Sequence, residues 1–263
     1  TDNSFLQPEA RDFIRSSIGL ADGEEDFFFF RRNFEELGPL TQNNRRETYR
    51  LVGGVRGKLG GNWSYEVSAN RARAMSRTRF TGNVNIQRYL LAIDAVRDPE
   101  SGEIVCRSRI DPSSASAYEG AADPAFAMEQ LAGDVAACVP LNPFGEGNIS
   151  PAARDYILAD GSTRSRIKQV VLNGFLSGDS SNWFELPGGP VGMAVGAEYR
   201  RERFRNVQDE LITAGLTHST SQPAFRPPSF SVKEAFGEVR LPLVKTVPGF
   251  RELTVTGAAR CAD

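Results

Sequence analysis

The stretch 182–204 holds the feature that most restricts how this chain can fold. From Val191 to Tyr199 every odd position is apolar, and the even positions between them are small or charged. A side-chain period of two with one apolar face is typical of a β-strand whose two faces meet different surroundings. Trp183 and Phe184 stand at the start of this stretch.

The same period recurs along the chain, and the connections between its copies alternate in length. Further strands are predicted at 48–56, 63–70, 163–176, 233–243 and 252–261. Short turns are predicted at 57–62, 177–181 and 244–250, and long connections at 72–162 and 205–231. Short turns on one side and long loops on the other favour an outer-membrane barrel over a soluble sandwich.

The alternation assigns a face to each side chain of these strands. We expect the apolar face to meet lipid and the polar face to line a wet lumen with cross-strand ladders. The expected lipid-facing residues are Trp63, Tyr65, Val67, Val191, Met193, Val195, Tyr199, Val239, Leu241, Leu253 and Val255. The expected lumen-facing residues are Arg50, Glu66, Asn70, Glu198, Arg200, Glu238, Arg240 and Arg260. Pro187 and Pro190 suggest a bulge or break in the wall near the periplasmic rim.

Helical patterns lie in the segments between the strands. Short helices are predicted within 4–18, 86–96 and 126–139, and near 150–158. A connection as long as 72–162 usually has a function of its own. The run Phe27–Phe30 is either a buried strand or an aromatic cluster that packs a loop or faces a ligand.

The three cysteines leave two alternatives open. Cys106, Cys138 and Cys261 could all be free thiols, or Cys106 and Cys138 could form a disulfide in an oxidising, exported compartment. Such a disulfide would fasten an exposed excursion of the chain. No C-x-x-C spacing exists and His218 is the single histidine, which argues against zinc.

Composition and motifs narrow the function classes. The net charge of −2 suggests no nucleic-acid partner, and no run of 18 apolar residues predicts a membrane-spanning helix. Gly57-Lys58 lacks the rest of a phosphate-binding loop, and no dinucleotide-binding glycine motif follows a strand. Catalysis through His218 would need a nucleophile motif that the sequence lacks. We therefore expect no enzyme activity, no cofactor and no metal.

Six segments in order resemble the barrel of TonB-dependent outer-membrane receptors, particularly those of Caulobacter- and Sphingomonas-type bacteria. They are TYRLVGGVRG (48–57), LGGNWSYEVS (59–68), CVPLNPFG (138–145), FELPGGPVGMAVGAEYRRE (184–202), KEAFGEVRLPL (233–243) and ELTVTGAAR (252–260). The resemblance implies an all-β fold: a partial antiparallel transmembrane β-barrel, the fragment of a 22-stranded barrel, with long extracellular loops that carry short helices. Residues 1–263 would be part of the barrel domain and hold roughly six to eight strands.

The resemblance also implies a function and partners. The bacterial outer membrane would be the location, and TonB-dependent uptake of a scarce nutrient, a siderophore or an oligosaccharide, would be the activity. The partners would be outer-membrane lipid, the small ligand, and the TonB complex through an N-terminal part. We expect the plug domain and the C-terminal strands to lie outside this chain, and Cys261 stands where the family would place an interfacial aromatic.

Two other classes remain as alternatives. A passive porin or a structural outer-membrane protein would share the strands but need no plug domain. A secreted β-rich hydrolase would have strands but no membrane-facing surface. The oligosaccharide alternative gains from aromatic residues in the loops, and the siderophore alternative gains from loop arginines, although both could simply pack the loops.

Overall fold

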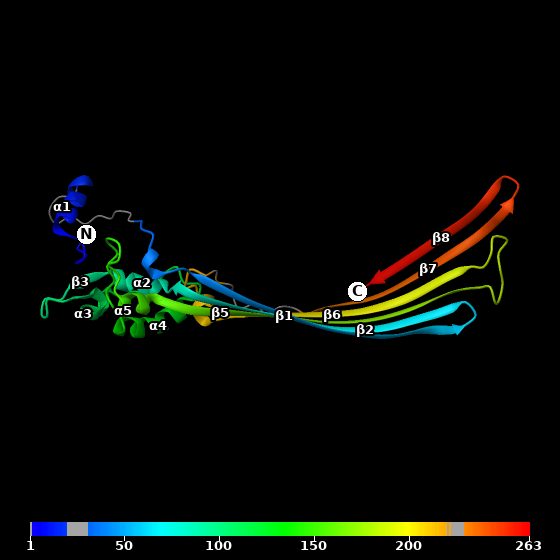
Figure 1. Ribbon diagram of the computed structural model, residues 1–263, viewed down its shortest axis with the longest axis horizontal. Coiled ribbons are helices and arrows are strands. Elements are labelled where there is room, and N and C mark those ends of the chain that lie inside the picture. The colour runs from blue at the N-terminus through cyan, green and yellow to red at the C-terminus, as the bar shows by residue number, and fades with distance from the viewer. Residues whose placement is uncertain (1, 20–30, 220, 222–228) are drawn as a thin grey trace. The chain divides into compact units, whose positions relative to one another are not determined.

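The computed structural model describes residues 2–19, 31–219, 221 and 229–263. Its regular structure is mostly antiparallel β-sheet, with a smaller share of helix (Figure 1). Six long strands form one sheet in the order β1-β2-β5-β6-β7-β8, and two short strands, β3 and β4, pair separately. The mostly antiparallel β class predicted from the alternation is thereby confirmed.

The strands of the large sheet are long, and each follows its sheet neighbour along the chain. They are β1 (Thr41–Gly60), β2 (Trp63–Val84), β5 (Leu158–Asp179), β6 (Gly192–Gln208), β7 (Ser229–Val247) and β8 (Phe250–Ala262). The small sheet pairs β3 (Ala95–Arg97) with β4 (Ile104–Cys106). Consecutive antiparallel pairing needs only hairpin connections, which suits the short turns of the sequence.

The helices lie in the segments before and between the long strands. They are α1 (Pro8–Ser17), η1 (Glu35–Leu37), α2 (Ile86–Ile93), α3 (Arg107–Ile110), η2 (Pro112–Ser114), α4 (Pro124–Ala136), α5 (Pro151–Ile157) and α6 (Glu210–Thr213). The side chains of Asn85, Asp123 and Ser150 accept hydrogen bonds from the first turns of α2, α4 and α5, which explains where these helices begin. All four predicted helices are present with shifted ends. In the part of the chain that the structure describes, no helix has the length and apolar character needed to cross a bilayer.

The chain divides into two compact units. The first contains Thr1–Asn44, Arg77–Thr163 and Val207–Phe225, and the second contains Arg45–Ser76, Arg164–Asn206 and Arg226–Asp263. The first unit holds the helices and a buried core around the Cys106–Cys138 disulfide. The members of that core are Leu37, Leu91, Ala92, Cys106, Cys138, Leu141, Ala153, Tyr156 and Ile157. The second unit consists of the greater part of the six long strands.

Several predicted strand ends are wrong. The first hairpin turns over Gly61 and Asn62 alone, so the predicted turn 57–62 is too long. The second strand continues to Val84 instead of ending near residue 70. Up to Ala69, one face of this strand is apolar, and from Arg71 onward the same face carries mainly arginines. The strand was predicted to end there because the apolar alternation ends, although the backbone continues as a strand.

The start of the sixth strand was also misplaced. The strand begins at Gly192, not at residue 182, and the connection before it is longer than the predicted turn 177–181. Pro187 and Pro190 lie in this connection, so the predicted bulge within the wall is wrong: proline lacks the N–H that a sheet ladder uses, and the ladder starts after both. The run Phe27–Phe30 lies outside the described residues.

Candidate functional site: a two-faced sheet and a disulfide-closed connection

One face of the second unit collects the alternating apolar side chains of all six strands, although the rings of Phe175 and Phe236 stack on the other face. The pairing of β6 with β7 sets Met193 opposite Val239 and Val195 opposite Gly237. The pairing of β7 with β8 continues the same row by setting Leu241 opposite Val255. Because paired residues project to the same side of a sheet, the alternating apolar positions of successive strands share one face.

The apolar side chains on this face are exposed. Leu51 is 75% exposed, Val195 51% and Val255 48%, values that would be unusual for a packed core. Trp63, Tyr65, Met193, Tyr199 and Leu241 are half-buried, and Val67, Val239 and Leu253 are exposed. No layer of helix or sheet covers them within the described part of the second unit. Ten of the eleven residues predicted to face lipid are therefore on an open apolar face.

Val191 is the exception. It is only 6% exposed, precedes the first residue of β6, and its backbone exchanges hydrogen bonds with Ser180 at 2.9 and 3.0 Å. The connection before β6 folds back over it, so this side chain packs against protein. Val191 continues the apolar alternation of β6 in the sequence, but its backbone lies outside the strand, so its predicted lipid-facing position is wrong.

The opposite face carries polar side chains that bind one another across strands. Arg50 donates to Asn70 at 3.2 Å, and Gln169 donates to Glu202 at 2.6 Å. Ion pairs join Arg260 to Glu234 and Arg240 to Glu252. All eight residues predicted to face a lumen lie here: Arg50, Glu66, Asn70, Glu198, Arg200, Glu238, Arg240 and Arg260. These bonds join several charged side chains of this face directly to polar side chains of neighbouring strands.

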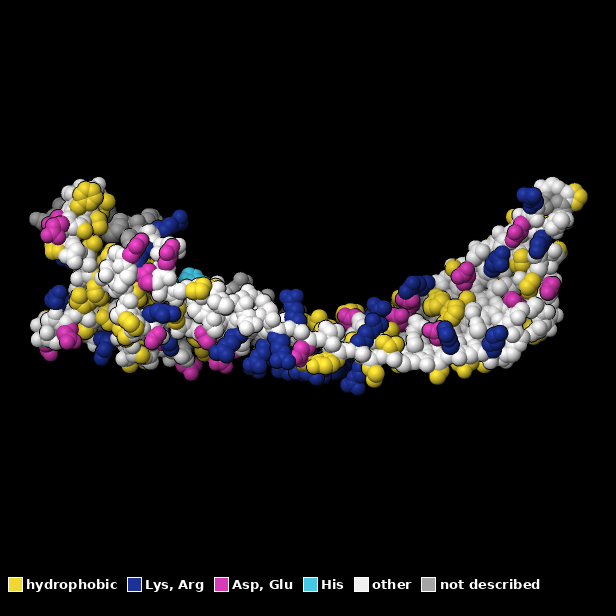
Figure 2. All heavy atoms as spheres, viewed as in Figure 1, with side chains coloured by type: hydrophobic (Ala, Val, Ile, Leu, Met, Phe, Trp, Pro, Cys, Tyr) yellow, Lys and Arg dark blue, Asp and Glu magenta, His cyan; other side chains and the backbone are white. Residues whose placement is uncertain are grey.

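Each end of the apolar face has a distinct border. At the turn end, the rings of Trp63 and Trp183 lie 6.0 Å apart, and Trp183 and Phe184 are exposed. At the other end the same strand face becomes basic, starting with Arg71 on β2. Figure 2 shows Lys and Arg side chains gathered over the middle stretch of the long strands. No role was predicted for these basic residues, although they occupy alternate positions after the apolar stretches of three strands.

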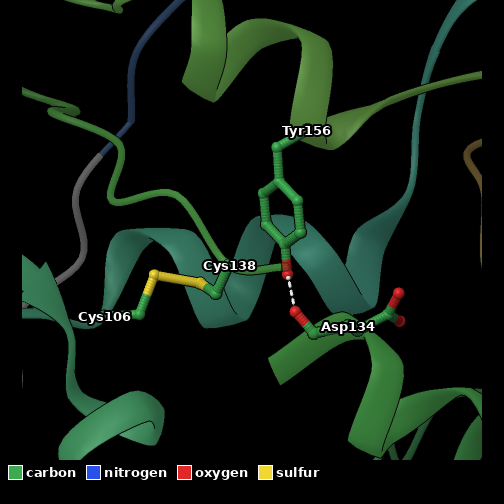
Figure 3. Close-up of a disulfide and its surroundings, with 4 residues drawn as sticks. All are labelled: Cys106, Asp134, Cys138 and Tyr156. Atoms are coloured by element: carbon green, nitrogen blue, oxygen red, sulfur yellow. Dashed lines mark hydrogen bonds between the residues drawn. A yellow bond between two sulfur atoms is a disulfide. The ribbon is translucent and has the colours of Figure 1, made fainter. Parts of the chain in front are cut away.

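The connection between β2 and β5 is fastened internally by a disulfide. Cys106 is the last residue of β4, Cys138 follows α4, and their sulfurs are bonded at 2.04 Å (Figure 3). Both cysteines are buried, whereas Cys261 is free and exposed. Of the two states that the sequence left open, the structure therefore contains the Cys106–Cys138 bond.

A buried polar network lies beside the disulfide. Asp134 is 3% exposed and accepts hydrogen bonds from Gln87 at 2.9 Å and from Arg88 Nε at 2.7 Å. The hydroxyl of Tyr156 donates to the backbone oxygen of Asp134 at 2.7 Å, as Figure 3 shows. Burial raises the pKa of Tyr156 well above its usual value, and the negative Asp134 adds to this shift. Complete pairing makes this network a structural brace for the connection.

A small cavity of about 330 Å³ lies next to this network. Gln87, Asp94, Ser108, Ser114 and Tyr118 contribute to its lining. The hydroxyl oxygen of Ser108 is buried and has no hydrogen-bond partner among the described residues. The volume of the cavity is at the lower end of the range for small-ligand sites, which is about 300–1,000 Å³.

The remaining candidates for chemistry stay apart. His218 is exposed in the connection after α6. Within residues 2–19, 31–219, 221 and 229–263, no group of three or more His, Cys, Asp or Glu side chains could hold a metal ion. The features of the described residues that could bind a partner are therefore the two sheet faces and the small cavity beside Ser108.

Comparisons of this chain with protein-family models, with curated proteins and with solved structures find no match.

Proposed function

We propose that this chain forms part of the wall of an outer-membrane β-barrel of the TonB-dependent receptor type. The open apolar face meets lipid, and the polar face lines the inside of the barrel. The single observation that carries the proposal is the exposed apolar face shared by six antiparallel strands. Water would penalise such a surface by about 25 cal/mol for each Å² of apolar area, whereas lipid would not.

The length of the apolar stretches supports the same proposal. The apolar alternation runs from Tyr49 to Leu59 on β1 and from Leu253 to Cys261 on β8. A tilted strand needs about 9–11 residues to cross the hydrocarbon core, and both stretches are in this range. Aromatic side chains at the turn end fit the aromatic girdles of such barrels.

The alternating connections give the proposed wall a direction. At one end, two-residue turns at Gly61-Asn62 and Pro248-Gly249 and the connection 180–191 join the strands, and the longer segments 85–157 and 209–228 join them at the other. Outer-membrane barrels have short periplasmic turns and long extracellular loops. The disulfide-closed connection would then be extracellular, where an oxidised cysteine pair is stable.

The long connections between the strands would bind the ligand. The expectation that this ligand is a siderophore or an oligosaccharide comes from the family resemblance. The cavity beside Ser108 is the described place where a polar ligand group could find an unpaired hydroxyl. Energy coupling through the TonB complex distinguishes this receptor from a passive porin. Uptake by the full-length protein should stop when the proton gradient of the inner membrane is dissipated, and uptake that continues would favour the porin.

A pair of arginine substitutions tests the membrane-facing assignment. Val195→Arg puts a charge in the centre of the apolar stretch of β6, and Ala194→Arg puts the same charge on the opposite face, across from Glu238. Arginine at the lipid midplane of a barrel costs about 2–4 kcal/mol. We expect Val195→Arg to reduce the partition of the chain into phosphatidylcholine vesicles, measured by flotation, and Ala194→Arg to leave it nearly unchanged.

Equal losses for both variants would contradict the proposal. A wild-type chain that remains a monomer in detergent-free buffer and does not float with vesicles would favour the secreted β-rich protein instead.

A further inference from the structure

The strand face that begins as an apolar surface ends as a basic one. Beyond the apolar stretches, Lys or Arg occupies most of the alternate positions of this face on three neighbouring strands. We call this set the basic belt, and its members are Arg73 of β2, Arg166 and Lys168 of β5, and Arg201, Arg203 and Arg205 of β6. All six belong to the second unit.

Hydrogen bonds on the opposite face fix how β5 and β6 are paired. Ser165 binds Asn206 at 2.7 Å and Gln169 binds Glu202 at 2.6 Å. With this register, Lys168 lies opposite Arg203 and Arg166 lies opposite Arg205. Directly opposed residues have Cβ atoms about 4.5–5.5 Å apart, and like charges in such positions are destabilising.

The β2 side extends the row. The hydroxyl oxygens of Ser64 and Ser177 lie 3.2 Å apart, and the side chain of Asn62 donates to the carboxylate of Asp179 at 3.1 Å. These contacts set β2 and β5 antiparallel in a register that brings Arg73 beside Lys168. Further along the same two strands, Arg79 binds Asp160 diagonally, two residues away from its directly opposed position in this register. Three basic side chains, Arg73, Lys168 and Arg203, therefore cross three strands in a single row.

The acidic residues of this region have partners other than the belt. Glu198 and Glu202 project to the opposite face, where they bind Asn173 and Gln169. No ion pair to a belt residue is found among the described residues, and the Nε atom of Arg73 is buried without a hydrogen-bond partner there. Five of the six side chains are exposed. The opposed positive charges are thus left for an anion from outside the chain.

We propose that the basic belt binds the phosphate groups of anionic lipids at the membrane surface. This inference rests on the proposed function, because lipid is the medium that meets the adjoining apolar face. Charge complementarity selects the partner: the apolar stretch takes acyl chains, and the row of guanidinium and ammonium groups directly beyond it meets the headgroup layer. A free phosphate would satisfy the charges but would not explain why the belt borders an apolar surface on the same face.

Two matched double variants test the proposal in the chain 1–263. Lys168→Gln with Arg203→Gln removes two charges from the belt. Arg200→Gln with Arg240→Gln removes two charges from the opposite face, where both arginines have acidic partners. Binding is measured by flotation with vesicles of phosphatidylcholine alone and with vesicles in which part of it is replaced by phosphatidylglycerol.

The wild-type chain should bind the anionic vesicles more tightly than the neutral ones. Each Lys or Arg near an anionic surface contributes on the order of a fivefold gain in partition, so the belt variant should lose about 25-fold of this preference. Its binding to neutral vesicles should match the wild type, which also shows that the variant is folded. The opposite-face variant should retain the full preference.

The following results would overturn the inference. A belt variant that keeps the preference, or an opposite-face variant that loses as much, would show that the belt does not select the lipid. Displacement by inorganic phosphate at constant ionic strength would assign the belt to free anions. Failure of the wild-type chain to bind either vesicle would overturn the proposed membrane function itself, whereas equal binding to both vesicles would overturn the belt proposal alone.

Discussion

At the scale of single residues, the disulfide is the strongest restraint on the long connection. Cys106 and Cys138 are 32 positions apart and both are buried. A cross-link that closes a loop of this size stabilises by about 3–4 kcal/mol in the chain-entropy description, mainly by restricting the unfolded state.

Replacing Cys106 and Cys138 together by alanine should therefore lower the free energy of unfolding of the helical connection by about 3–4 kcal/mol. Urea unfolding followed by far-ultraviolet circular dichroism measures the change. Cys261→Ser is the matched control and should have almost no effect, because Cys261 is exposed and unbonded. A control that destabilises as much as the double variant would contradict the prediction.

Two tyrosines of the same unit, the buried Tyr156 and the half-buried Tyr89, make its stability sensitive to high pH. Burial raises the pKa of both Tyr156 and Tyr89 above the ordinary tyrosine value of about 10. The unfolded chain then loses these protons first. The contribution of the two groups is fully present below the unfolded pKa and declines as the pH rises from there toward the folded pKa.

Tyr156→Phe should weaken this pH dependence. It also removes the hydrogen bond to the backbone of Asp134, which should cost about 1 kcal/mol near neutral pH. Urea unfolding at about pH 8 and about pH 11 separates the two effects, because only the loss of the titrating group changes the difference between these conditions. An unchanged difference in the variant would assign the pH dependence to other groups, such as Tyr89.

At the scale of elements, the helices of the connection begin where a side chain replaces the missing backbone partners. The carboxylate of Asp123 accepts from the N–H of Phe126 at 3.1 Å, and Pro124 occupies the first turn of α4. This helix carries Asp134 and leads into Cys138, so its start contributes to positioning the buried network.

Asp123→Ala should destabilise the helical connection by about 1 kcal/mol, the ordinary effect of losing an N-cap. Asp123→Asn keeps a capping oxygen and should lose much less. The comparison can be made by urea unfolding with far-ultraviolet circular dichroism. Equal losses in both variants would mean that the negative charge, rather than the capping hydrogen bond, stabilises α4.

At the scale of the whole molecule, β1 and β8 are the edges of the six-stranded sheet. An unpaired strand edge and an exposed apolar face both promote association in water. We expect the isolated chain to scatter light strongly in aqueous buffer and much less in detergent micelles.

Leu51 and Val52 offer a matched test of the cause. They are neighbours on the edge strand β1, are 75% and 55% exposed, and project to opposite faces. Leu51→Asp should reduce light scattering in buffer more than Val52→Asp, because only Leu51 belongs to the apolar face. Identical effects would place the origin of association in the unpaired edge instead.

The sequence alone indicated the strands and the faces of their residues, but not where each strand begins and ends. The alternation of apolar and polar side chains in Met193–Tyr199 and Trp63–Ala69 can be read from the sequence, because successive residues of a strand point to opposite faces. The helix positions were also predictable, since Asn85, Asp123 and Ser150 mark their starts by local hydrogen bonding.

Only the tertiary structure decided what depends on contacts between distant residues. Val191 continues the apolar alternation but is buried by its bonds to Ser180, and no local pattern shows this. The Cys106–Cys138 bond and the pairing of Gln87, Arg88 and Asp134 join residues far apart in the sequence. The basic belt was visible as alternating arginines, but it became a site only when pairing of β2, β5 and β6 set like charges side by side. The register between strands is a property of the folded sheet, and it decides which side chains of neighbouring strands lie next to one another on each face.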